Sequence, residues 1–241
     1  MNEPTHRSFL VVDVEDSGDL NNVELGTIRS TLYRILDAAI PSPEAVAAKE
    51  DRGDGGMLVL DLSVLDVLDQ IVEKLLDGVR SHNHTVDPLG WLRVRIAVHE
   101  GYVHEDENGW LSDALTATFR MNGARLVKDT LKNAARAHGV VVISDAVYQG
   151  VVRHSYRAAV TPAGYGSAVI STKEGDVRIW ARVPGYPAPP FPGGPAAATE
   201  AARSAAGATS VGYDSNTANN MFLGDVKARN IIGRDNHGRA V

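Results

Sequence analysis

The chain has 241 residues, with 24 Lys and Arg against 30 Asp and Glu, so its net charge of −6 argues against a general nucleic-acid-binding protein. It contains no cysteine, which excludes disulfides, thiolate zinc sites, iron–sulfur clusters and a cysteine nucleophile. No apolar run approaches the roughly 20 residues of a membrane-spanning helix, and no signal peptide is evident. We therefore expect a cytoplasmic protein with neither membrane nor nucleic acid as partner.

Composition divides the chain into three parts. Residues 1–183 alternate apolar runs with turn signals and are expected to form the folded domain. The segment 184–208 consists mainly of Pro, Gly and Ala with few large apolar side chains, so it is predicted to be a linker. A short tail of different composition follows at 209–241.

The first part predicts strands and helices in the order βαββαβαβαββ. Apolar runs and period-two alternation predict strands at 8–14, 45–50, 57–62, 92–100, 140–143, 167–172 and 177–183. Helical spacing of apolar residues predicts helices at 25–40, 64–79 and 145–153, and a largely helical segment at 111–137. This order favours an α/β sandwich with a mixed sheet.

Two aspartates follow predicted strands at positions that suit a metal site. Asp13 stands where the first strand ends, and Asp54 stands in the tight Gly-Asp-Gly turn of the predicted hairpin. If these strands are neighbours, the two carboxylates converge at one edge of the sheet and suit Mg²⁺ or Mn²⁺, which prefer oxygen ligands. The alternative is purely structural, because Asp is also a common helix cap and turn residue.

Three further polar residues are candidates for binding a substrate. Arg120 follows Thr116 by four residues on the predicted long helix, so the two share one face. The alternative for Arg120 is a solvated side chain or an intrahelical salt bridge. Lys173 opens a Lys-Glu-Gly-Asp hairpin turn, where it is either simply exposed or able to reach a phosphate as a point charge.

Together these pieces resemble the catalytic domain of class III nucleotidyl cyclases, the adenylate/guanylate cyclases, from about residue 9 to 183. Five motifs occur in the family's order: FLVVDVEDSGD, KEDRGDGGMLVL, LRVRIAVHEGYV, GWLSDALTATFRMNGARL and TKEGDVRIWARV. A divergent actinobacterial branch is similar in its GDG turn and Gly-Trp turn. The resemblance implies a ferredoxin-like, cyclase-type α/β sandwich whose mixed sheet is mostly antiparallel.

The resemblance also implies roles for four of the candidate residues. Asp13 and Asp54 match the family's two metal aspartates, which bind Mg²⁺ or Mn²⁺. Arg120 matches the arginine that stabilises the transition state, and Lys173 matches the lysine that faces the triphosphate. Arg95 falls in register with the family's Arg-Ile-Gly-Ile-His strand.

Other positions depart from the family pattern. Thr116 stands where the family has the asparagine that orients the ribose, and Phe119 replaces a small residue. Glu50, three residues before Gly53, stands at a base-reading position of the substrate-binding hairpin, but the second base-reading position aligns with Gly109. The base therefore stays open between purine and pyrimidine. The Gly-Phe-Thr type of turn after the first strand is replaced by Glu-Asp-Ser-Gly at 15–18.

The tail carries a second resemblance. Residues 219–238, which begin at Asn219 and end at Gly238, alternate small, β-branched and amide residues with regular glycines. This pattern is similar to the RIP homotypic interaction motif, whose Asn and Ile side chains can stack as cross-β structure. If so, the segment binds a partner protein with a similar segment. The alternative is a disordered polar tail.

Two functions follow from these resemblances. The first is a nucleotidyl cyclase, in which a head-to-tail homodimer converts a nucleoside triphosphate to a 3′,5′-cyclic nucleotide and pyrophosphate by two-metal catalysis in intracellular signalling. One protomer would give the metal aspartates and the other Thr116 and Arg120. The second is a cyclase-fold sensor or adaptor, weak or inactive as an enzyme, that signals through its tail in a regulatory or antiphage defence system.

Overall fold

An eight-stranded mixed sheet organises the domain, in the order β2-β3-β1-β4-β6-β8-β7, with β5 pairing β4 off this path. The computed structural model describes residues 3–107 and 109–194. The strands are β1 (Thr5–Val14), β2 (Val46–Asp51), β3 (Gly55–Leu60), β4 (Val94–Asp106), β5 (Gly109–Leu111), β6 (Gly139–Ser144), β7 (Tyr165–Thr172) and β8 (Gly175–Arg182). Among these strands β4 and β6 pair in parallel and the other pairings are antiparallel, which confirms the predicted sheet.

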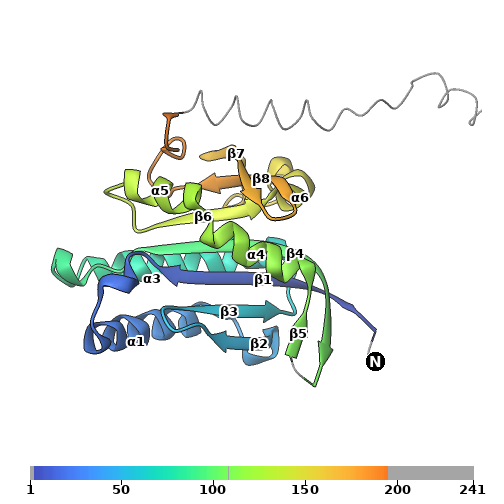
Figure 1. The fold of residues 1–241 in the computed structure, drawn as a ribbon, viewed down its shortest axis with the longest axis horizontal. Helices are drawn as coiled ribbons and strands as arrows, with labels where there is room; N and C mark the ends of the chain where they lie inside the picture. The colour runs from blue at the N-terminus through green and yellow to red at the C-terminus, as the bar shows by residue number, and fades with distance from the viewer. Residues whose placement is uncertain (1–2, 108, 195–241) are drawn as a thin grey trace, which may run out of the picture. The chain divides into compact units, whose positions relative to one another are not determined.

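Helices cover both faces of the sheet, as Figure 1 shows. They are α1 (Asn22–Ala39), α2 (Val64–Asp66), α3 (Glu73–Asn83), α4 (Asp113–Gly123), α5 (Arg125–Asn133) and α6 (Asp145–Gly150). A π-helical segment, Val67–Val72, joins α2 to α3. Short 3₁₀ helices occupy Ser17–Asp19, Pro43–Ala45, Pro88–Gly90 and Val152–His154. Helices α1, α3 and α6 pack in one core, and α4 and α5 pack in the other.

The central strand β1 shows how the sequence builds this arrangement. Its side chains alternate between the two cores because successive residues of a strand point to opposite faces. Leu10 and Val12 are buried in the core that holds α1, whereas Phe9 and Val11 are buried in the core that holds α4. Both faces of β1 are therefore apolar from Phe9 to Val12, and Asp13 follows on the α4 side near the end of the strand.

The segment predicted as largely helical from 111 to 137 is divided. Residues 109–111 form β5, which extends the β4 hairpin, and the Ser112 hydroxyl caps the start of α4 by accepting a hydrogen bond from the Leu115 amide at 3.1 Å. Ala124 then has an extended ψ of 135°, which ends α4 after Gly123 and lets α5 take a new direction. The predicted helix at 64–79 likewise contains a π-helical stretch.

The first residues of the predicted linker pack against the domain. Phe191 is 6% exposed and lies in the core that holds α4 and α5. The Tyr186 hydroxyl accepts a hydrogen bond from the Arg136 amide at 3.3 Å, and the Asn133 side chain donates one to the Pro190 carbonyl at 3.0 Å. The predicted tail motif at 219–238 lies outside the described residues.

Among helices in the described ranges, none has the length and apolar character needed to cross a membrane.

Candidate functional site

Backbone pairing brings Asp13 and Asp54 together. Asp13 pairs across the sheet with Gly55, the residue after Asp54, and the Val14 amide donates to the Asp54 carbonyl at 3.1 Å. A Cβ at Gly55 would lie 2.2 Å from the Val12 carbonyl oxygen, so only glycine allows the strands to approach this closely. The two predicted metal aspartates therefore lie at one edge of the sheet, as their positions in the sequence indicated.

The turn that carries Asp54 is held by contacts from within and from α1. Gly53 adopts a φ of 85°, a left-handed conformation that favours glycine. The Asp51 carboxylate accepts from the Gly53 amide at 2.9 Å, an Asx turn. From α1, the Tyr33 hydroxyl bonds both this carboxylate and the Gly55 carbonyl, at 3.2 and 3.1 Å, and Arg29 forms an ion pair with Asp51. These contacts fix the hairpin on α1.

Asp13 faces a buried arginine. The Arg95 Nε lies 2.8 Å from Asp13 Oδ1, and the Arg95 side chain is only 7% exposed. Burial raises the pKa of Asp13 and the nearby Asp54 carboxylate raises it further, whereas the Arg95 guanidinium lowers it; burial dominates. The Arg95 charge thus favours the ionised carboxylate in a setting that would otherwise favour its protonated form.

The carboxylates of Asp13 and Asp54 offer oxygen atoms of the kind that bind a divalent cation. Within the described residues, the buried Asp13 Oδ1 accepts no hydrogen bond despite its ion pair, and Asp54 lies close enough to affect its charge. The Ser17 hydroxyl donates to Asp54 Oδ2, which adds a third oxygen at the site. An all-oxygen set suits Mg²⁺ or Mn²⁺ with phosphate oxygens completing the coordination. In residues 3–107 and 109–194 no cluster of three or more His, Cys, Asp or Glu suits a metal, so this fit depends on two carboxylates.

The predicted cationic residues form a second group. Arg120 on α4 and Lys173 at the β7–β8 turn both line a cavity of about 880 Å³, with Arg125 beside them. Arg120 Nη1 forms an ion pair with Glu174 Oε2 at 2.5 Å. The Thr172 hydroxyl also contacts the Glu174 carboxylate, at 3.3 Å, so the hairpin turn holds this acid against the arginine.

Thr116 and Glu50 make contacts within their own elements. The exposed Thr116 hydroxyl donates to the Ser112 carbonyl one turn earlier, at 3.0 Å. Glu50 pairs with Arg52 at 2.9 Å, and the Arg52 guanidinium lies 4.9 Å from the centre of the Phe119 ring. Phe119 stands where the family has a small side chain. Through Arg52 it connects α4 to the β2–β3 hairpin that carries Asp54.

The predicted site residues thus occupy two separate groups in one chain. Asp13 lies near the end of β1 beside the β2–β3 turn that carries Asp54, whereas Arg120 and Lys173 line a cavity whose wall includes neither aspartate. The contact of Ser17 with Asp54 was not predicted from the sequence, because it depends on how the turn after β1 folds back. The role of Asp51 was not predicted either, although the Asp-x-Gly pattern is a signal for an Asx turn.

Comparison with known proteins identifies the fold. No protein-family model matches the sequence, and no curated protein matches it. The crystal structure of an adenylate/guanylate cyclase/hydrolase from Silicibacter pomeroyi is similar, with 17% identity and a TM-score of 0.54 over 76% of this chain and 98% of that chain. The catalytic core of a rhodopsin-guanylyl cyclase with converted specificity, in complex with ATPalphaS, has 18% identity and a TM-score of 0.51 over 75% and 98%. The chain therefore has the fold of adenylate/guanylate cyclase catalytic domains, which the motifs predicted.

Proposed function

We propose that this protein is a nucleotidyl cyclase, a phosphorus–oxygen lyase that forms a 3′,5′-cyclic nucleotide and pyrophosphate from a nucleoside triphosphate. One observation supports the proposal most directly. The carboxylates of Asp13 and Asp54 lie on paired neighbouring segments of the sheet, and the cationic side chains of Arg120 and Lys173 line one cavity. Each group supplies half of what phosphoryl transfer needs, a cation site and charge stabilisation. A homodimer would complete each active site from two protomers.

The reaction needs little covalent chemistry from the protein. The ribose 3′-oxygen attacks the α-phosphorus, its proton passes to solvent, and the bond from the α-phosphorus to pyrophosphate breaks. Asp13 and Asp54 would hold Mg²⁺ or Mn²⁺, which supplies a lowered pKa for the 3′-hydroxyl and neutralises phosphate charge. Arg120 would stabilise charge on the transferring phosphoryl group, and Lys173 would pair with the triphosphate.

The remaining predicted residues would place the nucleoside. The Thr116 hydroxyl would bond the ribose, and it lies on the same face of α4 as Arg120 because the two are four residues apart. The Glu50 carboxylate would read the base from the hairpin that Gly53 closes. The Thr116 hydroxyl, which donates to the Ser112 carbonyl, would accept a hydrogen bond from the ribose, and Glu50 would use the carboxylate oxygen that does not pair with Arg52.

The test is turnover. The purified chain is incubated with Mn²⁺ and, separately, ATP, GTP, CTP and UTP, and 3′,5′-cyclic products are measured by mass spectrometry. We expect one triphosphate to give product and Asp54→Asn to abolish it. Asp61→Asn is the matched control, since Asp61 follows β3 and pairs only at the surface with Arg7, at 3.0 Å. No product from any triphosphate, or full activity in Asp54→Asn, would reject the cyclase proposal.

A sensor or adaptor is the second candidate, and the contacts of Arg120 favour it. In one protomer the Arg120 guanidinium pairs with the Glu174 carboxylate, which would compete with a triphosphate for the same positive charge. On this proposal the domain binds a triphosphate without turnover and passes the signal to a partner of the tail. Binding of a triphosphate with no product would support it.

A further inference from the structure

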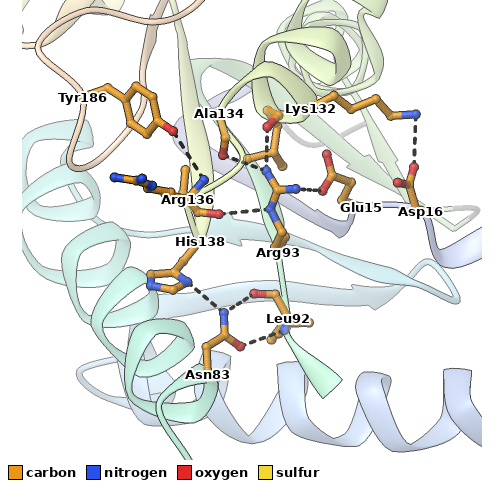
Figure 2. A network of polar contacts seen from close by, with 12 residues as sticks. Glu15, Asp16, Asn83, Leu92, Arg93, Lys132, Ala134, Arg136, His138 and Tyr186 are labelled. Atoms are coloured by element: carbon orange, nitrogen blue, oxygen red, sulfur yellow. Dashed lines mark hydrogen bonds and ion pairs between the residues drawn. The ribbon is translucent and has the colours of Figure 1, made fainter. Parts of the chain in front are cut away.

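The turn after β1 is anchored by an ion pair to Arg93, the residue before β4. Glu15 Oε2 lies 2.7 Å from Arg93 Nη1, and the Glu15 side chain is only 5% exposed (Figure 2). The Glu15 amide also donates to the Arg93 carbonyl at 2.8 Å, so main chain and side chain both fix this residue. One residue on, Asp16 pairs with Lys132 of α5 at 3.4 Å.

Arg93 is itself immobilised by the end of α5. Its Nη2 donates to the carbonyls of Leu131 and Ala134 at 2.6 and 3.0 Å, and its Nε donates to that of Ala137 at 3.0 Å. Figure 2 shows the guanidinium between these carbonyls and the Glu15 carboxylate. The carbonyls at the C-terminal end of a helix carry partial negative charge, so a cation here is favoured. Every nitrogen of the guanidinium is thereby used, and Arg93 is a rigid anchor for the turn.

The anchored turn reaches the cation site through Ser17. The Ser17 hydroxyl donates to Asp54 Oδ2. Between the anchor and this contact, Asp16 has a φ of 53°, a left-handed conformation that is strained for a residue with a Cβ. Such a conformation persists when the residues on both sides are held. Glu15 on Arg93 and Ser17 on Asp54 provide these two restraints.

We propose that Arg93 and Glu15 are positioning residues for the cation site, because they fix the turn from which Ser17 holds the Asp54 carboxylate beside Asp13. The inference rests on the proposed function, since it takes Asp13 and Asp54 as the ligands of Mg²⁺ or Mn²⁺. It assigns roles to Arg93, Glu15 and Ser17, to which the family resemblance gave none. Removal of a side chain that orients a metal ligand by a hydrogen bond commonly weakens metal binding about 10–100-fold.

The experiment measures Mn²⁺ binding to the full chain without nucleotide, by electron paramagnetic resonance of free Mn²⁺. Glu15→Gln keeps the size of the side chain, leaves Arg93 on α5 and removes the ion pair. Ser17→Ala removes the contact to Asp54 without changing charge. We expect each to weaken Mn²⁺ binding about tenfold, and Ser17→Thr to bind like the unmodified chain. Asp19→Asn is the control for loss of one negative charge from the same turn and is expected to stay within about twofold.

The double variant decides whether Glu15 and Ser17 act together. If both act by releasing Asp54, the Glu15→Gln, Ser17→Ala double variant binds Mn²⁺ no more than about tenfold more weakly than the unmodified chain, because effects along one path are not additive. Two results would overturn the positioning role. One is a loss of Mn²⁺ affinity in the double variant that equals the product of the two single losses, and the other is a Ser17→Ala affinity equal to that of the unmodified chain. Circular dichroism melting of each variant separates loss of binding from loss of folding.

Failure of this inference can be distinguished from failure of the proposed function. Mn²⁺ binding that is lost in Asp54→Asn but unchanged in Glu15→Gln and Ser17→Ala overturns the positioning role alone. Positioning effects in a chain that gives no cyclic product leave the inference standing and reject the cyclase. An unmodified chain that binds no Mn²⁺, or binds it equally after Asp54→Asn, overturns the cation site and the positioning role together.

Discussion

Gly53 determines the shape of the turn that presents Asp54. Its φ of 85° is strained for any residue with a Cβ, so we expect Gly53→Ala to lower the free energy of unfolding by about 1–2 kcal/mol. Gly26 is the matched control. It lies within α1 with open space around its Cα, so Gly26→Ala should raise stability by about 1 kcal/mol. Urea unfolding measures both, and a Gly53→Ala chain as stable as the unmodified one would contradict the role of the turn.

His99 makes stability depend on pH. Burial lowers its pKa to about 4, with a smaller contribution from His6, and Ser144 bonds its Nδ1 at 2.9 Å. The Ser144 hydroxyl oxygen already accepts from the Val147 amide, so its proton is available to a neutral His99. The histidine therefore stays neutral in the folded chain at pH values where the unfolded chain, with an ordinary pKa near 6.5, is protonated.

Folding stability should accordingly fall as pH drops from 6.5 towards 4, because the unfolded chain binds the proton more readily. The expected loss is up to about 3 kcal/mol. Urea unfolding at a series of pH values should show a shallower fall for His99→Gln than for the exposed His154→Gln control. Burial also lowers the pKa of His138, so the unmodified chain responds to both histidines and the difference between variants isolates His99. Equal slopes in the two variants would contradict the assignment.

Single residues also mark the limit of what the sequence could predict about the site. The places of Asp13 near a strand end and of Asp54 in a tight turn were predictable because strand ends and Gly-Asp-Gly turns are local patterns. Their partners were not, since Arg95 and Ser17 meet them only through strand register and the path of a turn. Register follows from the whole set of apolar contacts, so these contacts need the folded chain.

Among the elements, the long apolar runs were predicted within a few residues because their periodicity is strong. The segment 111–137 shows why some boundaries failed. Its helical spacing continues through α4 and α5, but Ala124 takes an extended ψ that no local pattern indicates. Strand β5 has only three residues, Gly109–Leu111, and is stabilised by pairing with β4 rather than by its own composition.

The β7–β8 hairpin is the element that engages Arg120. Its turn places Glu174 on this arginine, where the acid competes with any phosphate for the same charge. We expect Glu174→Gln to strengthen triphosphate binding about threefold, the size of a partly exposed ion pair. Fluorescence titration with each nucleoside triphosphate measures the change.

The same hairpin offers the control. Asp176→Asn removes an equal charge from an acid that bonds Ser171 at 2.7 Å and does not meet Arg120. Its affinity for the triphosphate is expected to rise less than that of Glu174→Gln. Equal gains in the two variants would mean that general charge repulsion operates and that the Arg120 contact has no specific effect.

At the scale of the molecule, the two groups of side chains that the proposed reaction needs lie in different parts of one chain. The aspartates lie near the end of β1, and Arg120 and Lys173 line a cavity on α4, α5 and β7. The segment 184–194 extends the wall of that cavity, since Pro192 lines it and Phe191 is buried beside it. A chain ending at residue 183 would therefore lack part of this wall.

This separation predicts complementation between inactive variants. Asp54→Asn and Arg120→Ala should each abolish turnover alone. Mixed in equal amounts, half of the dimers are expected to hold one chain of each kind, and one of their two sites then has an intact aspartate pair and an intact arginine. Activity should recover to about a quarter of that of the unmodified chain.

The matched control mixes Asp54→Asn with Asp13→Asn. Both changes fall in the aspartate group, so neither chain can supply the other with intact ligands and no mixed dimer has a complete site. If activity recovers in the mixture of Asp54→Asn with Arg120→Ala but not in this control mixture, one active site must contain residues from two chains. If the unmodified protein is active but the mixture of Asp54→Asn and Arg120→Ala is not, the aspartates and Arg120 of one protomer would have to act on the same substrate molecule.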